Sequence, residues 1–83
     1  MPGDWRTWNA MSLMGGAIAL QGRHEVADPL LRDGYEKMDP PSGSATRKRE
    51  ALERLIAHYE AWGRPEDAAR WRKATGPTPD QAR

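Results

Sequence analysis

The stretch LIAHYEAWGRPEDAARWRKA, Leu55–Ala74, contains the features that decide the fold. Apolar residues recur at helical spacing as far as Trp62, and Gly63 then interrupts the pattern, as a glycine that closes a helix does. Pro65 follows, and proline is well suited to the first position of a new helix. The stretch therefore predicts two helices joined by a tight turn, the second running from about Pro65 to Ala74.

The first half of the chain repeats this order of helix, glycine and helix. Asp4 can cap a helix that begins at Trp5 and is closed by Gly22. A second helix is predicted from about Arg23 to Lys37, and Pro29 requires it either to start nearer position 28 or to bend mildly. The predicted apolar positions are Trp8, Met11, Met14 or Gly15, Ile18 and Leu20 in the first helix, and Val26, Ala27, Leu30, Leu31, Tyr35 and Met38 in the second.

A proline- and glycine-containing segment separates the two halves. Residues 39–45 are the predicted linker, and a third helix is predicted from about Thr46 to Trp62. We therefore predict one domain over residues 1–76, with the first hairpin at 4–38 and the second at 46–74. Residues 77–83 are predicted to be a disordered tail.

The composition supports an all-α fold and excludes several classes of protein. The chain has 83 residues, no cysteine and a net charge of +1. Its β-branched aliphatic residues are few, which disfavours a sheet. The charge gives no strong attraction to nucleic acid or to an anionic membrane. No apolar run approaches the ~20 residues of a membrane-spanning helix, and we predict no signal peptide.

The two halves match each other residue by residue at an offset of 41 positions, set by Gly22 and Gly63. The other matched pairs are Met11 with Leu52, Met14 with Leu55, Ile18 with Tyr59, Arg23 with Arg64, Glu25 with Glu66, Ala27 with Ala68 and Leu30 with Trp71. An alanine shortly after each turn allows two antiparallel helices to approach closely. This order of large apolar residue, ring or isoleucine, glycine and alanine is typical of tetratricopeptide (TPR) repeats.

Three segments carry a more specific resemblance: SLMGGAIALQGR, ADPLLRDGYE and ALERLIAHYEAWGRPEDAARWR. Together they resemble the C-terminal TPR segments of large bacterial serine/threonine kinases, of the kind abundant in planctomycetes. The resemblance implies an all-α protein of two stacked antiparallel hairpins, a short right-handed solenoid that binds proteins in the cytoplasm. No glycine-rich nucleotide loop and no catalytic His-Arg-Asp stretch occurs, so kinase activity does not carry over.

No residue constellation in the sequence predicts catalysis or a cofactor. His24 with Glu25 and Asp28, or His58 with Glu60, could form at most a loose surface metal site. We interpret both histidines as surface or boundary residues and predict no metal. The acidic pairs near helix starts are explained by the helix dipole. We therefore expect a non-enzymatic protein.

The predicted function is protein–protein interaction. In TPR arrays the first helix of each hairpin lines a peptide-binding groove, and the residues predicted to face it here are Asn9, Ser12, Gly16, Ala19, Glu50, Glu53, Ala57 and Glu60. The glutamates would make one half of this groove acidic, which suggests a basic ligand segment.

The tryptophans at the start of the chain predict a second kind of contact. Trp5, Trp8 and Met11 stand where a preceding repeat would pack, so we predict an exposed patch that drives self-association, most simply as a homodimer, unless they fold back on the second helix. The alternatives are a purely structural, self-assembling repeat fragment and a nucleic-acid accessory that uses Arg47–Arg49. The nucleic-acid role is the weakest alternative, because carboxylates are interleaved with the basic residues.

Overall fold

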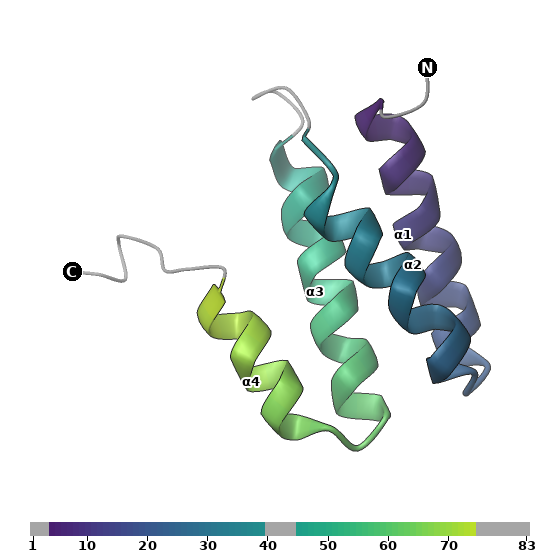
Figure 1. Cartoon of the computed structure of the whole chain (residues 1–83), viewed down its shortest axis with the longest axis vertical. Helices are drawn as coiled ribbons and strands as arrows, with labels where there is room; N and C mark the ends of the chain where they lie inside the picture. Colours follow the sequence, from purple (N-terminus) through teal and green to yellow (C-terminus); the bar gives the residue numbers. More distant parts are fainter. Residues whose placement is uncertain (1–3, 40–44, 75–83) are drawn as a thin grey trace.

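The structure, a computed structural model, describes residues 4–39 and 45–74, which form four helices and no strand (Figure 1). The helices are α1 (Trp5–Leu20), α2 (His24–Glu36), α3 (Ala45–Ala61) and α4 (Pro65–Ala74). The predicted all-α class and all four predicted helices are confirmed. The predicted tail at 77–83 and most of the predicted linker lie outside the described residues.

The helix ends follow the expected local chemistry. The Asp4 carboxylate accepts a hydrogen bond from the Arg6 amide at 3.1 Å and caps α1. Gly22 and Gly63 both have positive φ, 83° and 80°, a conformation that suits glycine. After each glycine, the next amide donates to a carbonyl five residues earlier: Arg23 to Ile18 at 3.3 Å and Arg64 to Tyr59 at 2.9 Å. The two repeats therefore end their first helices in the same way.

Helix α2 begins at His24 and continues through Pro29. The alternative start near Asp28 is therefore wrong. Pro29 has no N–H to donate to the carbonyl of Glu25, and the helix continues past it to Glu36. Val26, expected on the apolar face, is 46% exposed, and buried Ala27 takes the contact with the core instead.

Helices α1 and α2 pack closely because small residues line their contact. A Cβ atom added to Gly34 would lie 2.9 Å from the Ser12 amide nitrogen and from the Trp8 carbonyl oxygen. One added to Gly15 would lie 2.8 Å from Cγ of Leu31. Gly15 is therefore a point of close approach between the two helices. Because this narrow contact lies on the Ser12–Gly15 side of α1, Met14 and Leu20 point away from it and are exposed.

The core lies between the two hairpins and uses the repeated alanines as expected. Its buried members are Ala27, Leu31, Leu55, Tyr59 and Ala68. Trp71 is partly buried, and its ring lies nearly perpendicular to that of Tyr35, with 5.7 Å between the ring centroids. In Figure 1, α2 lies in front of α1 and α3, which also contact each other, and α4 lies on the side of α3 away from α1. Among the described residues, no helix has the length and apolar content needed to cross a membrane.

Candidate functional site

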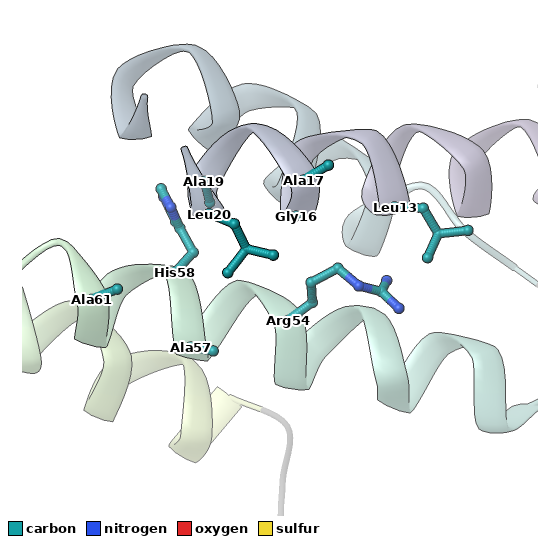
Figure 2. A pocket seen from close by; sticks show the side chains of 9 residues that line it. All are labelled: Leu13, Gly16, Ala17, Ala19, Leu20, Arg54, Ala57, His58 and Ala61. Atoms are coloured by element: carbon teal, nitrogen blue, oxygen red, sulfur yellow. The ribbon is translucent and has the colours of Figure 1, made fainter. Parts of the chain in front are cut away.

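A groove of about 380 Å³ runs between α1 and α3 (Figure 2). Its walls come from the first helix of each hairpin and are mostly apolar. The lining residues are Leu13, Gly16, Ala17, Ala19, Leu20, Arg54, Ala57, His58 and Ala61. None of them carries a carboxylate. The groove is therefore mostly apolar, and Arg54 and His58 are the polar side chains in its walls.

The spacing of the lining residues explains the shape of the groove. Leu13, Ala17 and Leu20 fall at helical intervals along α1, and Arg54, Ala57 and Ala61 do so along α3. The alanines leave space where larger side chains would fill it. Leu13 is 51% and Leu20 is 91% exposed, so two large apolar side chains meet solvent at this site.

Arg54 spans the groove from α3 to α1. Its Nη1 donates to Oγ of Ser12 at 2.7 Å, and Ser12 is fully buried. Gly16 leaves the space that the arginine stem occupies, because a Cβ added there would lie 2.7 Å from Cδ of Arg54. Among the ion pairs between described residues, none involves Arg54. The guanidinium in the groove is therefore not neutralised by a described carboxylate.

His58 joins the groove to a buried polar cluster. Its side chain is buried, with 2% of the residue exposed, and its Nδ1 lies 3.1 Å from Nδ1 of His24. Its Nε2 lies 3.2 Å from Oδ1 of Asp28. The Tyr59 hydroxyl donates to the same oxygen at 2.6 Å, and Arg32 donates to the other carboxylate oxygen at 2.9 Å. The cluster therefore connects α2 with α3.

The proton positions in this cluster follow from the carboxylate. Ionised Asp28 only accepts hydrogen bonds, so Nε2 of His58 must be the donor. In neutral His58, Nδ1 is then an acceptor, and Nδ1 of His24 donates to it. Both ring nitrogens of His58 are thus occupied.

Burial and hydrogen bonding shift the pKa values of the cluster. Burial lowers the pKa of His58 below its ordinary value, and this effect outweighs the opposing one of Asp28. Burial raises the pKa of Asp28, but hydrogen bonds from Tyr59 and His58, together with Arg32, bring it below its ordinary value. Burial and the bond to Asp28 raise the pKa of Tyr59 to about 12. A neutral histidine, a carboxylate and a neutral phenol are the forms expected near neutral pH.

The structure places only part of the predicted groove set in the groove. Gly16, Ala19 and Ala57 line it, and Ser12 lies buried behind Arg54. The remaining predicted residues, Asn9, Glu50, Glu53 and Glu60, do not line it.

The three glutamates predicted to make half of the groove acidic do not line it, because the lining face of α3 is offset by one residue from the predicted one. One residue is a rotation of about 100° around a helix axis. The glutamates consequently face elsewhere: Glu50 pairs with Arg47 at 3.2 Å, and Glu60 pairs with Arg72.

The predicted exposed patch of Trp5, Trp8 and Met11 is partly buried within the chain. The Trp8 ring lies 5.0 Å from Nζ of Lys37, so it folds back toward the end of α2. The large apolar side chains that α1 exposes are instead Leu13, Met14 and Leu20.

Lys48 of the basic run and His58 are not simply exposed surface residues. Lys48 points inward, and its Nζ donates to the carbonyls of Tyr35 and Met38 at 2.8 and 2.7 Å. The engagement of Lys48 divides the run Arg47–Arg49 and leaves no continuous basic strip there.

The interpretation of His58 as a surface or boundary residue is wrong, because it is buried. Among the described residues, no group of three or more potential ligands is placed to hold a metal ion.

Comparison with family models, curated proteins and solved structures gave no match to this chain. The sites must therefore be judged from their own geometry. Sequence reasoning missed the cluster of His24, His58 and Asp28. The signal for it was the repeat itself: the second helix of one hairpin packs on the first helix of the next, which sets position 28 opposite positions 58 and 59.

Proposed function

We propose that the chain is a non-catalytic protein-interaction module of the TPR kind, and that it binds its partner in the groove between α1 and α3. The observation that carries this proposal is the exposure of Leu13 and Leu20 beside a groove whose walls are otherwise small residues. Exposed apolar surface of this kind marks sites of association. The resemblance to TPR proteins adds support, and it also suggests a cytoplasmic location.

The polar cluster fits a structural role better than a catalytic one. Both nitrogens of His58 are engaged, and its lowered pKa disfavours proton uptake near neutral pH. The raised pKa of Tyr59 likewise disfavours proton release. A general acid or base needs a pKa near the working pH and reach to a substrate. We therefore assign the cluster to holding α3 against the first hairpin, which keeps the groove walls in place.

Selection of random linear peptides displayed on phage tests the proposed function. The purified chain is panned in parallel with Ala57→Trp, which fills the groove, and with Ala69→Trp, which places the same ring on an exposed site of α4. We expect peptides that bind the wild type and Ala69→Trp but are lost with Ala57→Trp. Enrichment that is equal on all three proteins, or absent, would contradict a binding groove.

Self-association is the second candidate, and the exposure of Leu13, Met14 and Leu20 favours it. A second copy could cover this face of α1 and form a homodimer. Light scattering on a sizing column over a range of concentrations gives the mass. A dimer that Leu20→Gln dissociates, and that Trp8→Ala leaves intact, would support this candidate. A monomer at every concentration would eliminate it.

We regard a nucleic-acid accessory role as weaker than self-association, because Lys48 is engaged inside the protein.

A further inference from the structure

We propose that the occupant of this groove is an amphipathic α-helix of another protein, and that it presents an acidic side chain to Arg54. The inference rests on the proposed function and names the class of partner. Three properties of the groove carry it: the scarcity of polar groups in its walls, the helical spacing of its small residues, and the charge of Arg54.

The scarcity of polar groups favours a helix over an extended peptide. An extended segment brings backbone N–H and C=O groups that need partners when they are buried. Among the lining side chains only Arg54 and His58 are polar, and both nitrogens of the His58 ring are already engaged. A helix satisfies its own backbone and can bury one apolar face without such partners.

The walls also have the form that a third helix requires. Ala17 and Leu20 on α1, and Ala57 and Ala61 on α3, lie about one helical turn apart, and the alanines leave room for side chains of a neighbouring helix. Figure 2 shows Leu20 and Arg54 projecting into the space between α1 and α3. A helix that lies there would pack its apolar side chains against the alanines and Leu20.

The positive charge of Arg54 determines that the partner should carry a negative charge at this point. Arg54 donates to the neutral hydroxyl of Ser12, and no ion pair between described residues neutralises it. Covering this guanidinium with a wholly apolar helix would desolvate an unpaired charge, which is unfavourable. A glutamate or aspartate on the partner would pair with it. A second copy that docks through α1 does not supply this group, because residues 5–20 contain no carboxylate.

Two patterned peptide libraries on phage test the inference. The first places leucines at helical spacing and randomises the polar positions; the second has prolines at regular intervals and cannot form a helix. We expect binders lost with Ala57→Trp to come from the first library and to share an Asp or Glu at one position relative to the leucines. Groove-dependent binders from the proline library, or without an acidic residue, would overturn the inference and leave the proposed function intact. No groove-dependent binder from either library would overturn both.

A charge exchange on a selected peptide provides the second test, measured as Kd by fluorescence anisotropy. Arg54→Glu should weaken binding by about tenfold or more, and exchanging the peptide's acidic residue for lysine should restore it. Arg49→Glu is the matched control, since Arg49 is exposed on the same helix and does not line the groove. Equal weakening by both variants, or no restoration, would overturn the role of Arg54. A proline at the centre of the peptide should abolish binding, whereas a proline at its N-terminus should not.

Discussion

The Nδ1 atoms of His24 and His58 lie 3.1 Å apart, although the two residues belong to different hairpins. His58 also lines the groove, and it bonds to Asp28 of α2 on its other side. Arg54, one turn earlier on α3, bonds to Ser12 of α1. The same face of α3 therefore joins the hairpins and forms a groove wall. Any substitution that weakens these contacts between the hairpins should also alter the shape of the groove.

The first prediction concerns pH. The folded-state pKa of His58 lies below its ordinary value of 6.5, so its neutral form stabilises the fold fully above that pH and less as the pH falls. Asp28 acts in the same direction, but only below its ordinary value of 3.8. Urea unfolding should show the free energy of unfolding decreasing from pH 7.5 to pH 5, by at most about 1.4 kcal/mol per pH unit for this one proton.

His58→Gln separates this effect from general acid sensitivity. Glutamine can still donate to Asp28 but does not titrate, so the variant should be less stable at pH 7.5 and lose less stability toward pH 5. If the variant and the wild type have parallel pH profiles, His58 is not the group responsible.

The second prediction concerns the short bond from Tyr59 to Asp28. Tyr59→Phe removes one donor and should cost about 1 kcal/mol of unfolding free energy. Asp28→Asn also weakens the bonds from His58 and Arg32 and should cost about 2–3 kcal/mol. Because the two residues interact directly, the double variant should lose less than the sum, by about 1 kcal/mol. Strict additivity in urea unfolding would show that the bond contributes nothing to stability.

The third prediction contrasts two helical glycines. Alanine at Gly34 would press on the backbone of Ser12 and Trp8, which cannot move without separating α1 from α2. Gly34→Ala should therefore lose about 1–3 kcal/mol. Alanine at Gly16 meets only the flexible stem of Arg54, and its better helix propensity offsets that contact. Gly16→Ala should stay within about 1 kcal/mol of the wild type. Similar melting temperatures for the two variants would contradict the close packing of α1 on α2.

The backbone was largely predictable from the sequence, because its determinants are local. Asp4, Gly22 and Gly63 end or begin helices through chemistry that involves only neighbouring residues. The repeat then identified Ala27 and Ala68 as contact residues, and both are buried as predicted. The helix boundaries lie within one residue of those expected.

The site was predictable only in part, because it depends on how helices rotate against each other. The residues of α3 that line the groove are offset by one position from those predicted. This offset places Arg54 in the groove where glutamates are predicted. The pairing of His24 with His58 depends on the packing of α2 against α3, and no local pattern encodes it. Trp8 lies against Lys37 at the end of α2, which is the alternative that the sequence left open for this residue.

The last prediction concerns Lys48, which ties the start of α3 to the end of α2. Its ammonium donates to the carbonyls of Tyr35 and Met38, and it lies 4.7 Å from the centre of the Tyr35 ring. Carbonyls at the end of a helix have no partner within it, and a cation there also favours the helix dipole. Lys48→Met keeps most of the apolar stem and should lose about 1–3 kcal/mol of unfolding free energy. Arg49→Met, at the exposed neighbouring position, should change it by less than about 0.5 kcal/mol. Equal urea midpoints for the two variants would mean that the carbonyls of Tyr35 and Met38 are satisfied as well by water as by Lys48.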